Sequence, residues 1–163
     1  MNDPMRILKA DHREAEKLLK QLSDSEEGSE RQKMVDELTM KLTAHMEMEE
    51  TLIYPTVRES VGQEDEEEAE VEHRLAREGL DKLNSMVEMP GFGAAVEMLK
   101  GGIMHHVEEE ENELLPELKD AVSREQWTAM GDALASAKQE RGMPVPQPAR
   151  RRSSKRRTKA KSR

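Results

Sequence analysis

The sequence contains no cysteine and only one tryptophan, one tyrosine and one phenylalanine among its 163 residues. The lack of cysteine excludes disulfides, thiolate-held iron–sulfur clusters and thiol nucleophiles. The scarcity of aromatic residues argues against a β-sandwich or barrel. No apolar run approaches the roughly 20 residues of a membrane span, and the first residues lack the apolar core of a signal peptide. We therefore expect a soluble, cytoplasmic protein that has no membrane partner.

Basic residues are unevenly distributed along the chain. Ten of the 26 lysines and arginines, and none of the 35 acidic residues, lie in residues 141–163, so an acidic body precedes a basic segment. Residues 142–163 contain three prolines and few apolar residues, which cannot bury enough surface to offset the entropy of ordering. We therefore predict a disordered tail. Its charge favours weak, sequence-independent contact with nucleic acid or another acidic partner.

Residues 1–141 are predicted to form one all-α domain. Apolar residues recur there at alternating intervals of three and four, the period of a buried helix face, in four segments: 4–22, 29–55, 69–87 and 95–118. Short connections between long helices predict an antiparallel four-helix bundle. Asp3 is the expected N-cap of the first helix. A short fifth helix over 122–141, with Ser123 and Gln126 as a capping box, is expected on the outside or at one end.

Six polar residues lie on these stripes where a core residue is expected. They are His12, His45, Glu49, His73, His106 and Glu110. A buried, unpaired carboxylate costs several kcal/mol, so each glutamate requires a partner. Histidine–glutamate pairs that neutralise each other are one solution, and shared metal ions are another.

The same six residues belong to an internal repeat with an offset of 61 residues. In each copy two histidines are separated by 33 residues, and the second histidine is followed by a glutamate four residues later. The segment HMEMEETLIYP (45–55) matches HVEEEENELLP (106–116), including the final proline. Two copies of one helical hairpin, packed about a pseudo-two-fold axis, predict a symmetric binuclear site.

The spacing also indicates which ions the site would bind. Residues i and i+4 lie on one helix face, so His45 and Glu49 can bind one metal, as can His106 and Glu110. Imidazole and carboxylate donors together suit iron, with manganese the weaker alternative. If both glutamates bridge, each ion has two nitrogens and two oxygens, and a bridging oxo or hydroxo adds a fifth ligand. One position on each ion then stays open for dioxygen, peroxide or nitric oxide.

This pattern resembles the hemerythrin-like family of HHE cation-binding domains over about residues 5–118. The resemblance implies a non-haem, oxo-bridged di-iron centre inside a four-helix bundle. Oxygen carriers of the family have a further histidine ligand at the position of Arg77. Their last carboxylate ligand lies at the position that Glu111 occupies in this chain. The chain is more similar to the symmetric subgroup with four histidines and two glutamates. Members of that subgroup are associated with peroxide decomposition and with redox or nitric-oxide responses.

Four further residues are candidates for supporting roles. Pro55 loosens the turn that carries Tyr54, which would allow the phenol to swing inward and block, bind or reduce one metal; the alternative is a tyrosine at the end of the bundle. Glu50 and Glu111 neighbour the predicted ligands and are alternative or outer carboxylates. His105 has no counterpart in the repeat and is expected at the surface or behind a ligand.

The sequence leaves three functions open. The first is catalase-type decomposition of hydrogen peroxide at the di-iron site, in redox defence. The second is a module that binds or senses dioxygen or nitric oxide. The third is an iron-responsive or structural bundle. A ferritin-like centre is a poorer fit, because it requires two Glu-x-x-His pairs and only Glu70 with His73 provides one.

Overall fold

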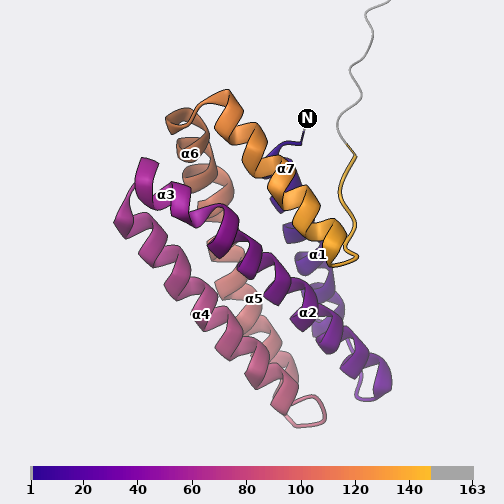
Figure 1. Ribbon diagram of the computed structural model, residues 1–163. Coiled ribbons are helices and arrows are strands. Elements are labelled where there is room, and N and C mark those ends of the chain that lie inside the picture. The colour runs from indigo at the N-terminus through magenta and orange to yellow at the C-terminus, as the bar shows by residue number, and fades with distance from the viewer. Residues whose placement is uncertain (1, 148–163) are drawn as a thin grey trace, which may run out of the picture.

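The computed structural model describes residues 2–147, and all regular structure in that range is helical (Figure 1). The elements are α1 (Pro4–Ser23), α2 (Ser29–Leu52), α3 (Tyr54–Ser60), α4 (Gln63–Ser85), α5 (Phe92–Glu109), the π-helix η1 (Glu110–Leu114), α6 (Leu115–Ala121) and α7 (Arg124–Glu140). In this part of the chain no helix is both long enough and apolar enough to span a membrane.

The long helices α1, α2, α4 and α5 form the predicted four-helix bundle. Helices α1 and α2 form one antiparallel hairpin, and α4 and α5 form the other; each hairpin contains one copy of the repeat. Helix α7 lies outside the bundle along α1 and α2 (Figure 1). The prediction of an all-α bundle with an appended fifth helix is therefore confirmed.

The predicted helix caps are present at both ends of the described chain. The Asp3 side chain accepts a hydrogen bond of 3.1 Å from the backbone of Met5. Ser123 and Gln126 form the reciprocal capping box at the start of α7, with bonds of 3.1 and 2.9 Å. Gly142 follows α7 with a φ of 67°, the left-handed conformation that ends many helices.

The two copies of the repeat differ at their prolines. Helix α2 ends at Leu52, and the chain turns at Ile53 before α3 starts with Tyr54 and Pro55. In the second copy the chain passes through η1 before Pro116 and continues into α6. A proline lacks an N–H and crowds the preceding turn; a break relieves this in one copy and a π-helical turn relieves it in the other.

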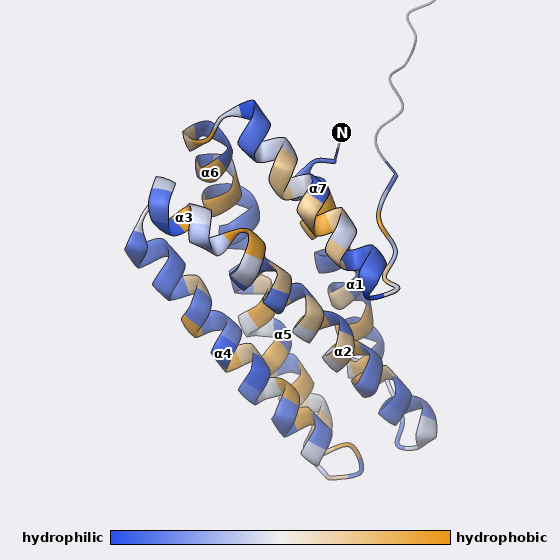
Figure 2. Cartoon of the chain, viewed as in Figure 1, coloured by the Kyte–Doolittle hydropathy of each residue, from blue (hydrophilic) through white to orange (hydrophobic). Residues whose placement is uncertain are grey.

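The apolar core consists of two clusters. One lies towards the connections at residues 24–28 and 86–91 and includes Leu19, Leu38 and Leu83. The other lies under α3, α6 and α7 and includes Met48, and Trp127 of α7. Hydrophilic and hydrophobic residues alternate along each helix (Figure 2), as in helices with one buried face. In α1 and α4 the buried histidine lies between the two clusters in chain order, whereas in α2 and α5 it comes one residue before Met46 and Val107, at the end of the first cluster.

Part of the predicted disordered tail is described. Residues 142–147 follow α7 without regular structure, and Val145 packs against the cluster that contains Trp127. The guanidinium of Arg6 donates a hydrogen bond to the carbonyl of Gln147. The rest of the predicted tail, residues 148–163, lies outside the described residues.

The capping box leads to a prediction about the stability of α7. Ser123→Ala removes the hydroxyl that accepts from the backbone of Gln126 and should lower the free energy of unfolding by about 1 kcal/mol. Urea unfolding followed by circular dichroism measures this. Ser136→Ala, on the exposed face of the same helix, is the matched control and should leave stability unchanged or slightly raised. Equal effects of the two substitutions would contradict the role of the cap.

Candidate metal centre

The structure brings the six sequence-predicted residues into one buried layer across the bundle. His12 comes from α1, His45 and Glu49 from α2, His73 from α4, His106 from α5, and Glu110 from the first residue of η1. Each is at most 8% exposed. Both copies of the repeat therefore contribute the same three residues, two histidines and one glutamate, as the spacing predicted.

The first histidine pair consists of His12 and His45. Their Nε2 atoms are 3.2 Å apart. Oε1 of Glu49 lies 3.1 Å from Nε2 of His45, and Oε2 of Glu110 lies 3.2 Å from Nε2 of His12. One potential ligand atom from each of these four residues lies within 4.8 Å of the others, which is compatible with a single metal ion.

The second pair consists of His73 and His106, whose Nε2 atoms are 3.1 Å apart. Oε2 of Glu49 lies 3.2 Å from Nε2 of His73. The two oxygens of Glu49 thus face different histidine pairs, as a bridging carboxylate would. Glu110 groups with the first pair, so the geometry places Glu49, more than Glu110, between the two positions.

The glutamates provide a test of whether the site fits a cation. Both oxygens of Glu49 and both oxygens of Glu110 are buried, and none accepts a hydrogen bond from the described residues. A buried carboxylate without compensation is strongly unfavourable. Four nitrogens and four uncompensated oxygens in one layer are a donor set that a pair of cations would satisfy, and their mixture suits iron.

The electrostatics of the layer agree with this. Burial disfavours the charged form of His45, but the carboxylates of Glu49 and Asp11 outweigh it and raise its pKa to about 10. Burial likewise opposes ionisation of Glu49, but His45 and His73 hold its pKa well below the usual value. The layer therefore favours ionised carboxylates beside positive charge.

Each histidine has an outer carboxylate at its other ring nitrogen. The Nδ1 atoms of His12, His73 and His106 donate to Glu111, Glu50 and Glu72 at 2.8, 2.9 and 2.6 Å, and Nδ1 of His45 lies 3.5 Å from Asp11. Such partners fix the ring orientation and leave the Nε2 atoms directed at the centre of the layer.

The structure shows which glutamates face the centre of the layer and which lie behind the histidines. Glu50 and Glu111 lie behind histidines, so Glu110, and not Glu111, faces the centre. Asp11 and Glu72 were missed as functional residues. The signal was present, since they occupy equivalent positions of the repeat, each immediately before a histidine.

Cationic side chains hold these carboxylates in turn. Arg77, at the position of the carriers' extra histidine, binds both oxygens of Glu50 at 2.8 and 2.9 Å and is not directed at the centre. Glu111 contacts Arg13 at 2.7 Å. His105 is largely exposed and lies 3.7 Å from Glu72, on its outer side. This matches the expectation of a surface residue for His105.

Tyr54 lies in the buried layer. Its side chain is fully buried, and its hydroxyl is 3.0 Å from Nε2 of His73. The turn at Ile53 reorients the chain there, so the phenol points inwards, which is one of the two alternatives that the sequence left open. Burial and the carboxylates Glu49 and Glu110 raise its pKa, which keeps the phenol neutral. The equivalent residue in the other copy, Leu115, is apolar and offers no hydroxyl to the first histidine pair.

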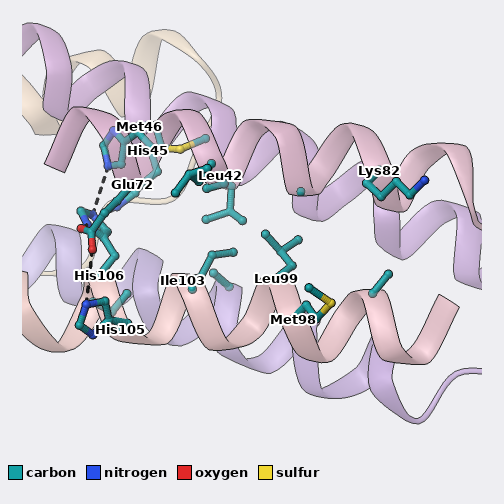
Figure 3. Close-up of a pocket in the computed structure, with 18 of the residues that line it drawn as sticks. Leu42, His45, Met46, Glu72, Lys82, Met98, Leu99, Ile103, His105 and His106 are labelled. Atoms are coloured by element: carbon teal, nitrogen blue, oxygen red, sulfur yellow. Dashed lines mark hydrogen bonds and ion pairs between the residues drawn. The ribbon is translucent and has the colours of Figure 1, made fainter. Parts of the chain in front are cut away.

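A cavity of about 630 Å³ reaches the layer from one side (Figure 3). All four histidines of the layer line it, whereas Glu49 and Glu110 do not. The glutamates lie one helical turn beyond their histidines, towards α3 and α6. The cavity therefore approaches the histidines from the side away from the carboxylates.

Lys138 is a buried cation that the sequence did not indicate. It lies on α7, is 0% exposed, and forms an ion pair with Asp11, the carboxylate that faces His45. The fifth helix thus contacts the outer shell of the first histidine pair. No comparable lysine faces Glu72 among the described contacts.

This ion pair yields a prediction about stability. Lys138→Met leaves Asp11 without its cation and should lower the free energy of unfolding by about 3 kcal/mol. Adding Asp11→Asn should recover part of the loss, with a coupling of at least about 1 kcal/mol. Lys41→Met is the control, because Lys41 pairs with exposed Glu14 and Glu37 and should lose less than about 1 kcal/mol. Strict additivity of the two substitutions in urea unfolding would refute the coupling.

Known proteins are similar to this chain in fold and sequence. A solved structure of a hemerythrin HHE cation binding domain-containing protein from Mycobacterium kansasii has a TM-score of 0.76 and 25% sequence identity, covering 87% of this chain and 89% of that one. An uncharacterized hemerythrin-like protein of Schizosaccharomyces pombe is 26% identical over 132 residues, and a DNA nickase of a Nostoc species is 29% identical over 133 residues.

The matches differ in how much of each protein they cover. The aligned regions are 78% and 81% of this chain but 65% of the Schizosaccharomyces protein and 38% of the Nostoc protein. Residues 3–118 match the Hemerythrin HHE cation binding domain family, and this range contains all six residues of the layer. With the bundle and the His/Glu layer both in place, the chain belongs to the hemerythrin HHE cation-binding family.

Proposed function

We propose that the six residues of the layer hold two iron ions that share an oxo or hydroxo bridge, and that the centre decomposes hydrogen peroxide. The observation that carries the binuclear part is the placement of Glu49. Its two oxygens lie 3.1 and 3.2 Å from histidines of different pairs, so one carboxylate serves both positions. Histidine nitrogens and carboxylate oxygens together suit iron, with manganese the weaker alternative.

The symmetry of the donors favours peroxide chemistry over reversible oxygen carriage. Each pair has two histidines, and Arg77, in the place of a further histidine ligand, is occupied with Glu50. The proposed reaction converts two molecules of hydrogen peroxide into two of water and one of dioxygen. Bound iron would supply the change of redox state that this reaction requires.

Residues of the chain give a ligand access to the histidines, orient the histidine rings and hold their protons. The cavity leads to the histidines from the side opposite the glutamates, which leaves room for a small ligand there. The outer carboxylates hold the Nδ1 protons and fix the rings. The buried hydroxyl of Tyr54, 3.0 Å from Nε2 of His73, is a neutral hydrogen-bonding group beside the second position.

The test combines metal content with oxygen evolution. The purified chain, loaded with ferrous iron, should contain about two irons per chain and release dioxygen from hydrogen peroxide. Glu49→Gln removes the shared carboxylate charge; iron should fall to one or fewer per chain, and oxygen evolution by about 100-fold. Glu47→Gln is the matched control, because Glu47 lies on the same helix but is exposed.

Three results would contradict the proposal, each in a different way. Equal oxygen evolution by Glu49→Gln and the unaltered protein would remove the assigned role of the layer. Two bound irons with no oxygen evolution, but with a reversible spectral change on exposure to dioxygen or nitric oxide, would favour a binding or sensing module. Failure to bind iron on reconstitution would favour a structural bundle.

We propose as a second function that the basic segment contacts nucleic acid. Ten lysines and arginines without an acidic residue occupy residues 141–163, and the Nostoc relative is named as a DNA nickase. The matched region is 38% of that protein, so the proposal concerns binding and not cleavage.

Removal of residues 148–163 tests this second function. The intact chain should bind double-stranded DNA of any sequence weakly, and the affinity should fall steeply as salt rises. The truncated chain should lose the binding but keep its helical content and its iron. Equal retention of DNA by both forms in fluorescence anisotropy would rule out the segment as the contact.

A further inference from the structure

The cavity beside the histidines is far larger than a peroxide-binding site requires. Its volume is about 630 Å³, whereas a water molecule in the liquid occupies roughly 30 Å³. Protein interiors normally contain few voids larger than a water molecule. Ligand pockets, by contrast, fall in the range of roughly 300–1,000 Å³ and are lined mainly by apolar groups.

The cavity is a long, apolar slot lined mainly by α4 and α5, with residues of α1 and α2 such as Ala15 and Leu42 completing its wall. Buried Leu42, Leu99 and Ile103 line its length, and Figure 3 shows them between the histidines and Lys82. On α4, Lys82 and His73 are nine residues apart, which is about 14 Å at ~1.5 Å per residue. The slot therefore matches an extended chain better than a compact molecule.

Helices α4 and α5 each contribute a glycine to the wall of the slot: Gly79 lets Leu99 pack closely, and Gly102 leaves open space. Gly79 lies on α4 opposite Leu99, where an added Cβ would come within 2.6 Å of that leucine. Across the slot, Gly102 of α5 has open space at its Cβ position. The large apolar side chains Leu75 and Met98 line the slot and are 59% and 80% exposed. A chain lying in the slot would cover apolar surface that is otherwise exposed to water.

The charges at the two ends differ. Among the charged residues that line the slot, Lys82 is the one farthest from the histidines, and its amine is directed away from them (Figure 3). Glu72 lies at the histidine end, where it accepts from His106. An anionic group is therefore favoured at the Lys82 end and repelled by Glu72 at the other. The apolar part of such a ligand would extend towards the histidines.

We propose that this slot is a binding site for a linear aliphatic carboxylate, with the carboxylate at Lys82 and the hydrocarbon chain directed at the histidine layer. This binding site is separate from the metal centre. Its apolar walls and its lysine do not depend on bound iron. The bound chain would lie across the cavity-side approach to the histidines. If the peroxide reaction holds, occupancy of the slot should slow it.

Isothermal titration of the full-length, iron-loaded protein with hexanoate, octanoate, decanoate and dodecanoate tests the proposal. Each added methylene that reaches apolar wall should tighten binding by about fourfold. The gain should level off once the chain reaches the histidines. Decylamine, which has the same chain with a cationic head, should bind more weakly than decanoate.

Two pairs of variants locate the site. Gly102→Leu should fill the slot and weaken decanoate binding by at least about tenfold, because its side chain takes the place of several methylenes. Gly101→Leu is the control: it makes the same change on the same helix at a position that does not line the cavity. Lys82→Gln should weaken decanoate binding roughly two- to fivefold, while Lys100→Gln should not.

The proposal fails if no carboxylate of the series binds, or if affinity is independent of chain length. It also fails if Gly102→Leu and Gly101→Leu behave alike, since binding would then lie elsewhere. A dimer in light scattering that Gly102→Leu dissociates would assign the slot to a second copy of the chain and overturn the ligand. Because binding is measured as heat, a negative result in the peroxide assay does not affect these outcomes.

Discussion

The structure depends on the burial of two carboxylates that the chain does not compensate by hydrogen bonds. Glu49 and Glu110 have four buried oxygens without a donor among the described residues, in a layer where histidine rings are the nearest polar groups. Burial of such charges is strongly unfavourable unless a cation is shared between them. The apolar clusters on either side of the layer provide the stability that permits this arrangement.

Charge alternates outwards from this layer. Inner carboxylates face histidines, histidines donate to outer carboxylates, and these are held by cations such as Arg77 and Lys138. Each group fixes the orientation of the next group inwards. A carboxylate that is held by a cation, for example, restricts the histidine ring from which it accepts a hydrogen bond. The outer carboxylates of the site therefore account for part of the negative charge of the chain's acidic body.

The two halves of the centre are similar in sequence but not equivalent in structure. Tyr54 provides a hydroxyl to the second histidine pair, where the other copy has Leu115. Lys138 reaches the outer shell of the first pair from a helix outside the repeat. Glu49 lies between the pairs, while Glu110 faces one of them. A two-fold donor set thus acquires two chemically different positions.

By itself, the sequence determined the bundle, its caps and the six residues of the layer, because helical periodicity and a repeat of 61 residues are properties of linear spacing. Only the tertiary structure decided that Asp11 faces His45, that Lys138 joins the site and that a slot lined by all four long helices reaches the histidines. These contacts join residues that are distant in the chain. They depend on the length and conformation of side chains and on backbone turns, such as those at Ile53 and in η1. The spacing of residues along the sequence does not predict these features.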